Sequence, residues 1–284
     1  MLLIMFFLTC TAAIAFMCFG AKSSRKWVRN SFYLYGALFT LVTLGLLAIN
    51  VQNNDDFIRS AWREVTKKAE LTAEAEPFLT SENRIQDSVH LKAPLVKQLP
   101  ELPRGCEVAS LAMLLQYNNI DANKMTLADQ VRKNPRSHKV TDGKVHFGNP
   151  NNGFVGDMTS FENPGLGVYH GPVAELAKRY VDPQRVRDFT GSDFSEIIQQ
   201  LNEKRPVWVI INATYKKLPK KAFVTWHTED GPVKITKREH SVLITGYDEK
   251  YIYFNDPLAR ETKAPMQPFK EAWEQMGKQA ITIR

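Results

Sequence analysis

The sequence predicts an α+β protein with an antiparallel sheet, preceded by a two-helix transmembrane hairpin. Two observations lead to this fold class. The chain begins with two long uncharged apolar stretches, and farther on, helical segments precede a run of β-rich segments. The chain has 284 residues, of which 44% are hydrophobic and 24% charged. These values are ordinary for a globular protein and exclude a chain that is disordered or collagen-like throughout.

Residues 1–51 are expected to form two transmembrane helices. Residues 2–19 and residues 31–51 contain no charge, and each stretch is long enough to cross about 30 Å of hydrocarbon. A cleaved signal peptide is the alternative for the first stretch, although it lacks a basic start. The loop at 21–30 is basic, which predicts a bacterial multi-pass membrane protein with an extracytoplasmic C-terminal domain.

Residues 52–86 are predicted to be an amphipathic stalk and linker, and residues 87–284 a soluble domain. The net charge of +7 is not gathered into a dense basic stripe with interleaved aromatic residues, so nucleic acid is not an expected partner. Three cysteines without a CxxC pair or a Cys/His cluster predict neither a disulfide framework nor a zinc site. No metal and no cofactor are expected.

The elements of the domain follow from periodicity and turn residues. An extended, proline-rich approach leads to Cys106, where apolar residues at helical spacing begin a core-facing helix. Residues 143–171 hold seven of the fifteen glycines, which is typical of a functional or mobile loop. Further helices are expected from Pro172 and from 194–204. The expected strands are 207–212, 222–226, 233–236, 241–247 and 251–255.

Cys106 is the candidate nucleophile. It is the only cysteine outside the two apolar stretches, and it follows Gly105 at a helix start. Free N–H groups and the helix dipole favour a thiolate there, so the sequence predicts a lowered thiol pKa. The alternative is a small buried hydrophobic residue without chemistry.

His240 and Asp256 are the candidate base and orienting group. Residues 241–247 and 251–255 form a predicted hairpin, and a three-residue loop would pair Tyr247 with Tyr251. His240 and Asp256 then lie on the same face as Val242, one diagonal step apart, where a carboxylate can orient an imidazole. The helix of Cys106 is expected to pack on that face. A structural His–Asp pair is the alternative, and His227 is a rival base.

Gln98 is the candidate oxyanion donor. It lies eight residues before Cys106 in the extended approach, where its amide could join the Cys106 backbone N–H in stabilising a developing negative charge. A solvated loop glutamine is the alternative. His90, His138, His146 and His170 are scattered and are interpreted as surface residues.

Three stretches together resemble a known family. LPRGCEVASLAMLL, GLGVYHGPVAELAKRY and WHTEDGPVKITKREHSVLITGYDEKYIYFNDP are similar to the C39-like branch of papain-like cysteine peptidases, the family of bacteriocin double-glycine-leader peptidases, in its membrane-anchored bacterial form. The resemblance covers roughly residues 90–284. It implies a papain-like fold, with Cys106 as nucleophile, His240 as base, Asp256 as orienting residue and Gln98 in the oxyanion hole.

The resemblance implies a membrane-anchored thiol peptidase acting on a peptide or protein substrate. Leader-cleaving members are fused to ABC transporters, and this chain contains no GxxxxGK[ST] motif, which argues against double-glycine leader cleavage. A cell-wall amidase or a thiol acyltransferase would use the same thiol chemistry. A non-catalytic module that binds a peptide at the cell envelope is the alternative from a different class.

Overall fold

The computed structural model describes residues 11, 14–16, 18–19, 25–53 and 85–284. The chain divides into two compact units, residues 1–81 and 82–284, and each is described by itself. The division lies close to the domain boundary that the sequence predicts near residue 87.

The N-terminal unit contains α2 (Lys26–Asn53), a helix of 28 residues with many exposed apolar side chains. Phe16 stacks on Phe39 of α2 with ring centroids 5.5 Å apart. None of the helices in the described part of the chain combines the length and apolar character that crossing a membrane requires. The structure therefore does not support the predicted transmembrane hairpin, and the extracytoplasmic location stays a prediction. Most of 2–19 and of the stalk at 52–86 lies outside the described residues.

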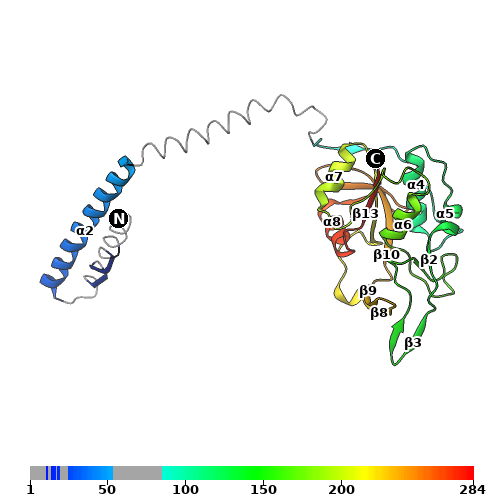
Figure 1. The fold of residues 1–284 in the computed structure, drawn as a ribbon, viewed down its shortest axis with the longest axis horizontal. Coiled ribbons are helices and arrows are strands. Elements are labelled where there is room, and N and C mark those ends of the chain that lie inside the picture. Colours follow the sequence, from blue (N-terminus) through cyan, green and yellow to red (C-terminus); the bar gives the residue numbers. More distant parts are fainter. Residues whose placement is uncertain (1–10, 12–13, 17, 20–24, 54–84) are drawn as a thin grey trace. The chain divides into compact units, whose positions relative to one another are not determined.

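A seven-stranded sheet forms the centre of the C-terminal unit (Figure 1). Six strands follow one another in the spatial order β12 (Lys263–Pro265), β11 (Tyr251–Asn255), β10 (Glu239–Tyr247), β7 (Val207–Asn212), β13 (Ala280–Ile283) and β6 (Val186–Asp188). The seventh strand, β1 (Val89–His90), pairs with β10 outside this series. Every pairing in this sheet is antiparallel, which confirms the predicted α+β class.

Helices cover both faces of this sheet (Figure 1). One face packs against α4 (Cys106–Tyr117), α5 (Lys124–Gln130) and α6 (His170–Ala177). The other packs against α7 (Phe194–Asn202) and α8 (Met266–Gln275). Leu243 of β10 belongs to the core under α4, whereas its neighbours Val242 and Ile244 belong to the core under α7 and α8. The expectation that the Cys106 helix packs on the Val242 face is therefore wrong.

The β10–β11 hairpin departs from the predicted register near its turn. Tyr247 pairs with Ile252 rather than with Tyr251, so the connection is one residue longer than expected. A β-bulge between Ile244 and Gly246 absorbs the extra residue on β10, and beyond it Ile244 pairs with Phe254 as predicted. Because of this bulge, the residues far from the turn lie on the faces of the sheet that the sequence predicts.

A smaller four-stranded sheet lies beside the main one. It contains β3 (Lys139–Thr141), β4 (Lys144–His146), β8 (Val224–Thr228) and β9 (Gly231–Ile235). The predicted strands at 222–226 and 233–236 thus form β8 and β9, in a sheet of their own around Trp226 and Phe147. In the glycine-rich loop, β5 (Phe154–Val155) forms a short parallel pair with β2 (Lys133–Asn134), which precedes the loop. The 3-10 helix η3 (Lys220–Ala222) precedes β8.

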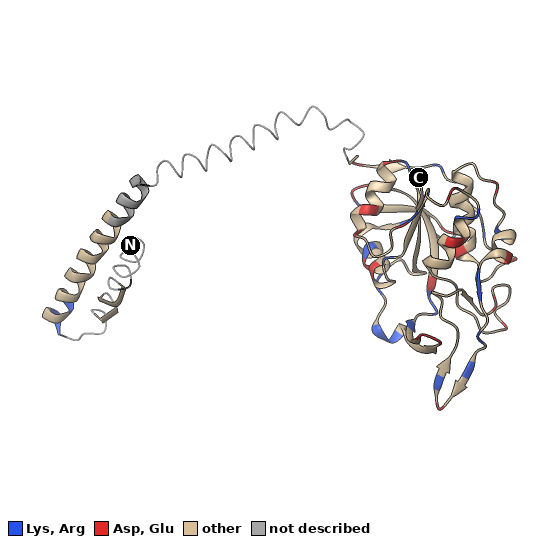
Figure 2. Cartoon of the chain, viewed as in Figure 1, with Lys and Arg blue, Asp and Glu red and all other residues tan. Residues whose placement is uncertain are grey.

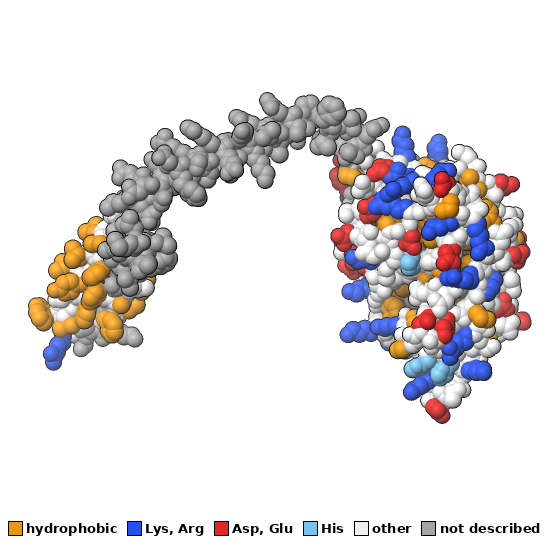
Figure 3. All heavy atoms as spheres, viewed as in Figure 1, with side chains coloured by type: hydrophobic (Ala, Val, Ile, Leu, Met, Phe, Trp, Pro, Cys, Tyr) orange, Lys and Arg blue, Asp and Glu red, His pale blue; other side chains and the backbone are white. Residues whose placement is uncertain are grey.

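Charged side chains are spread over the C-terminal unit. Figure 2 shows Lys and Arg on both strands of the β3–β4 hairpin, and acidic residues on several other elements. On the face seen in Figure 3, Lys and Arg side chains alternate with Asp and Glu side chains. The expectation about nucleic acid stays a prediction.

Candidate active site

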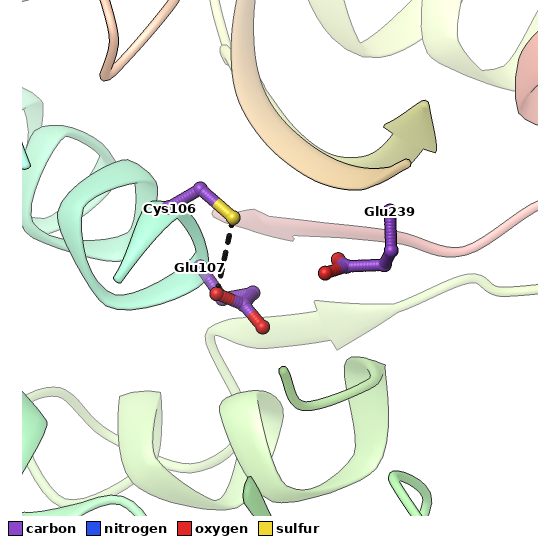
Figure 4. A group of neighbouring side chains, drawn as sticks. All are labelled: Cys106, Glu107 and Glu239. Carbon is purple, nitrogen blue, oxygen red and sulfur yellow. Dashed lines mark hydrogen bonds between the residues drawn. The ribbon is translucent and has the colours of Figure 1, made fainter. Parts of the chain in front are cut away.

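Cys106 is the first residue of α4, as the sequence predicts. Its side chain is buried, with 5% of its surface exposed. Gly105 precedes it because the chain turns tightly here: a Cβ at this position would lie 2.5 Å from Cβ of Leu102. The Cys106 Sγ–H donates a hydrogen bond to Oε2 of Glu107 at 3.1 Å (Figure 4). Within residues 85–284 the sulfur makes no hydrogen bond to His240.

The sulfur lies in a cluster with two carboxyl groups. Donor atoms of Cys106, Glu107 and Glu239 all lie within 4.8 Å of one another, and Figure 4 shows the Glu239 carboxyl pointing toward the other two. Burial raises the pKa of the thiol well above its usual value, and the negative charges of Glu107 and Glu239 raise it further. The direction of this shift is opposite to the lowered thiol pKa that the sequence predicts, because burial and nearby charge outweigh the backbone hydrogen bond from Ser241.

Both carboxyl groups of this cluster are also shifted. Burial raises the pKa of Glu107 to about 7, although the N–H of Val168 donates to its Oε1 at 2.6 Å and opposes the shift. Burial and the charge of Glu107 raise the pKa of Glu239 well above its usual range. The sequence reasoning missed both residues. A glutamate inside the otherwise uncharged helix of Cys106, and another directly before His240, were the available signals.

His240 and Asp256 are in direct contact. Nε2 of His240 lies 2.7 Å from Oδ1 of Asp256, and both side chains are buried. Tyr215 Oη donates to Oδ2 of the same carboxylate at 2.9 Å, and the N–H of Leu258 donates to Oδ1 at 2.8 Å. Burial would raise the pKa of Asp256, but the hydrogen bond and charge of His240 outweigh it and keep this carboxyl ionised. Because Nε2 faces Asp256, Nδ1 is the nitrogen left for chemistry.

Gln98 is buried beside the Cys106 turn. Its Nε2 donates to the backbone carbonyls of Leu102 at 3.2 Å and Pro103 at 2.8 Å. Its Oε1 is buried without a hydrogen-bond partner among the described residues. In this state the amide braces the segment that leads into α4. The solvated-loop alternative is wrong, since 2% of Gln98 is exposed.

A cavity of about 610 Å³ joins the candidate residues. Gln98, Cys106, Glu239 and His240 line it, together with Trp226 and residues 161–166 of the glycine-rich loop. Aromatic rings and the side chains of Arg104, Lys237, Arg238 and Arg260 form much of the remaining wall. The cavity can therefore present an extended substrate to the sulfur and to the imidazole.

His227 does not belong to this cavity wall. It lies on β8 of the smaller sheet, with its ring centroid 5.3 Å from that of His146 on β4. This position removes the structural basis for His227 as a rival base. His138, which the sequence left as a surface residue, does line the cavity.

The Cys106–Glu107–Glu239 cluster is the group of described residues with a spacing suited to a cation. Both oxygens of Glu107 already accept hydrogen bonds, from Val168 N–H and from the Cys106 thiol. Coordination would require these bonds to break, so we assign no metal to the cluster. The prediction of a cofactor-free site stays a prediction.

Comparison with known proteins identifies the family. The model of the peptidase C39-like family matches residues 90–281. The chain therefore belongs to the peptidase C39-like family. YvpB, an uncharacterised protein of Bacillus subtilis strain 168, is 47% identical over 186 residues, which is 65% of this chain and 71% of that protein.

A solved structure supports the fold of this C39-like domain. The crystal structure of a Bacillus anthracis protein assigned as a C39-like peptidase is 44% identical, with a TM-score of 0.65. It covers 70% of this chain and 98% of that protein. The resemblance seen in the sequence is thus confirmed at the level of family and fold.

Proposed function

We propose that this chain is a cysteine peptidase that hydrolyses peptide bonds with Cys106 as nucleophile, His240 as base and Asp256 as orienting residue. The observation that carries the proposal is the shared cavity: the buried sulfur and the Asp256-bound imidazole open onto the same space. The membership of a peptidase family supports the same reaction class.

The reaction would proceed by acyl transfer to sulfur. Nδ1 of His240 takes the thiol proton as Sγ of Cys106 bonds to the scissile carbonyl carbon. The imidazolium, stabilised by ionised Asp256, returns that proton to the leaving amine as the carbon–nitrogen bond breaks. Water then hydrolyses the thioester with His240 acting again as base. Because the thiol starts protonated, proton transfer accompanies attack instead of preceding it.

Oxyanion stabilisation would come from the Cys106 backbone N–H at the start of α4, with Gln98 as the proposed second donor. Gln98 meets the requirement of position, since it lines the cavity with Cys106. Its amide must turn away from the carbonyls of Leu102 and Pro103 to donate to the substrate. This rearrangement is part of the proposal.

The protonated thiol also favours the non-catalytic alternative. A sulfur that donates to Glu107 and has a raised pKa is a poor nucleophile at rest. A module that binds peptides in the same cavity would need no more than this. The two functions differ in whether an acyl-enzyme forms, and a variant series can decide between them.

The test uses the full-length protein and a mixed peptide library, with cleaved bonds read by mass spectrometry. Wild-type protein should cleave, and Cys106→Ala and His240→Ala should abolish cleavage. Asp256→Ala should lower turnover less than either, because the orienting residue does not itself exchange the proton. His227→Ala is the matched histidine control and should retain activity.

Library cleavage that persists in Cys106→Ala would exclude the thiol mechanism. Absence of both cleavage and a trapped Cys106 acyl-enzyme, with peptides still bound, would establish the binding module instead. An acyl group that passes to an added amine faster than to water would favour the acyltransferase.

A further inference from the structure

We propose that Glu107 and Glu239 form a buried acid pair that holds one proton and keeps the Cys106 sulfur a neutral thiol at rest, with Glu239 acting on the sulfur through Glu107 as a positioning residue. The proposal rests on the proposed function in so far as Cys106 is the nucleophile. The pair and its effect on the thiol can be measured without any substrate.

The two carboxyl groups reach the sulfur from different elements. Glu107 follows Cys106 on α4, and its side chain is fully buried. Glu239 opens β10, directly before His240. Because successive strand residues point to opposite faces, Glu239 shares the parity of Leu243, whose side chain packs under α4. The fold thus brings a second carboxyl to the sulfur from the sheet.

The backbone of the glycine-rich loop closes over the pair. A Cβ at Gly167 would lie 2.2 Å from Oε1 of Glu107 and 2.7 Å from Oε2 of Glu239. A side chain at this position would therefore displace both carboxyl groups. The next residue, Val168, donates its N–H to Glu107. The glycine-rich loop thus encloses the acid pair.

The hydrogen bonds of the two carboxyl groups indicate that Glu239, rather than Glu107, holds the proton. Glu107 accepts from Val168 N–H and from the Cys106 thiol, and both bonds favour an ionised carboxylate. Oε1 of Glu239 is buried and has no hydrogen-bond partner among the described residues, which favours the neutral acid. Two like charges at this spacing in a buried site cannot both be held without compensation.

The surrounding groups do not supply that compensation. Lys133 on β2 is the cation whose charge acts on Glu107, and burial lowers the pKa of its own ammonium group. Tyr169, which precedes α6, is neutral, because burial and the charges of Glu239 and Glu107 raise the pKa of its phenol. His240 points its Nε2 to Asp256. One cation faces two carboxyl groups, so one proton remains on the pair.

The consequence for Cys106 is a hydrogen-bonded, protonated thiol. The negative charge that faces the sulfur opposes loss of the thiol proton, and Glu107 holds the S–H bond in one direction. As the pH rises above neutral, Glu239 loses its proton and adds a second negative charge beside the sulfur. Gln cannot ionise, so Glu239→Gln should let the thiolate form at lower pH.

The test follows alkylation of Cys106 by iodoacetamide against pH in the full-length protein. Mass spectrometry of the Cys106 peptide separates this site from Cys10 and Cys18. Wild-type protein should show an inflection above the free-thiol value of about 8.5. Glu239→Gln should move the inflection to lower pH and raise the alkylation rate in the alkaline range at least about threefold, because Gln cannot ionise there. Glu239→Asp keeps an ionisable carboxyl group and should restore the wild-type profile.

Glu162→Gln is the matched control, because Glu162 lines the same cavity. It should leave the inflection unchanged. An inflection that stays at the wild-type pH in Glu239→Gln, or that moves equally in Glu162→Gln, would overturn the proposal.

A measurement on wild-type protein covers the case in which Glu239→Gln does not fold. The infrared C=O band of a protonated carboxylic acid should persist at about pH 7, well above the ordinary glutamate pKa of about 4.3. A spectrum without this band at that pH would overturn the proposal. Neither measurement involves peptide cleavage, so loss of the proposed peptidase function would leave the result on the acid pair standing.

Discussion

At the residue scale, the candidate site contains two kinds of buried carboxyl group, one with a lowered pKa and one with a raised pKa. Asp256 accepts hydrogen bonds from His240, Tyr215 and backbone N–H groups, and these keep its pKa below the usual range despite burial. Glu107 accepts fewer hydrogen bonds, so burial dominates and raises its pKa. Carboxyl groups therefore supply a fixed anion beside His240 and a proton-holding pair beside Cys106.

The raised pKa of Glu107 predicts a pH-dependent cost in stability. Its ordinary value is 4.5 and its folded value is about 7. Between these values the unfolded chain loses the proton while the folded protein keeps it, so the contribution of Glu107 to stability falls as pH rises through this window. We expect Glu107→Gln to gain melting temperature relative to wild type from about pH 4.5 to about pH 7, with no further gain above.

The measurement is thermal unfolding of both proteins across pH. The exposed Glu249→Gln is the control and should show no such trend. A difference between Glu107→Gln and wild type that is constant across the window would contradict the raised pKa.

Gln98 gives a second prediction at this scale. If its amide turns to the oxyanion, Gln98→Ala should lower kcat by about 10²–10³ and change KM little. Steady-state kinetics with a peptide identified from the library would measure both constants. Near-normal kcat together with a lower melting temperature would instead assign Gln98 the bracing role that its bonds to Leu102 and Pro103 already have.

At the element scale, strand β10 decides which groups meet the sulfur. Its alternate residues face the α4 core and the α7–α8 core, and its two ends serve different purposes. The first end carries Glu239 and His240 to the cavity. The other end contains the β-bulge, beside which Gly246 pairs with His90 of β1.

Substitution of Gly246 would test how much the close pairing of β1 with β10 contributes to stability. A Cβ at Gly246 would lie 2.2 Å from the carbonyl oxygen of Val89, and a backbone atom cannot move aside as a flexible side chain can. Gly246→Ala should therefore destabilise the protein by about 1–3 kcal/mol. Denaturant unfolding would measure this loss.

Gly171→Ala is the matched control. The nearest atom to a Cβ there is the Asn151 carbonyl oxygen at 3.8 Å, and the position lies within α6. The added methyl group has room, but Pro172 disfavours a helical residue with a Cβ before it, so this variant should lose less than about 1 kcal/mol. Equal losses in both variants would contradict the argument from strand pairing.

At the scale of the whole molecule, the C-terminal unit contains its own cores. The two main clusters of buried side chains, one on each face of the large sheet, draw on residues 89–283. The family match at residues 90–281 covers the same region. The unit should therefore fold without residues 1–81.

The prediction is that a fragment of residues 82–284 unfolds cooperatively, with a melting temperature within about 3 °C of the corresponding transition in the full-length chain. Calorimetry of both proteins would measure it. A fragment that is unfolded, or that melts far below the full-length transition, would show that the first unit contributes to the stability of the second.

The sequence by itself determined the local features of this protein. The spacing of apolar residues placed the helix that begins at Cys106, and turn residues with alternating patterns placed β7 and β11 at their observed bounds. The alternation of side chains along the two strands predicted that His240 and Asp256 lie together. The turn is one residue longer than expected, and the β-bulge in β10 preserves this alternation. These features depend on neighbours along the chain or across one hairpin, which is why local pattern was sufficient.

The tertiary structure determined which groups surround the Cys106 sulfur. The sequence argument put the Cys106 helix on the wrong face of β10, and therefore missed Glu239. It also predicted a lowered thiol pKa from the helix start alone. Burial and charge act through space, and they depend on how α4, β10 and the loop around Gly167 pack together. That packing, which no local pattern encodes, makes the thiol neutral at rest and gives the site its acid pair.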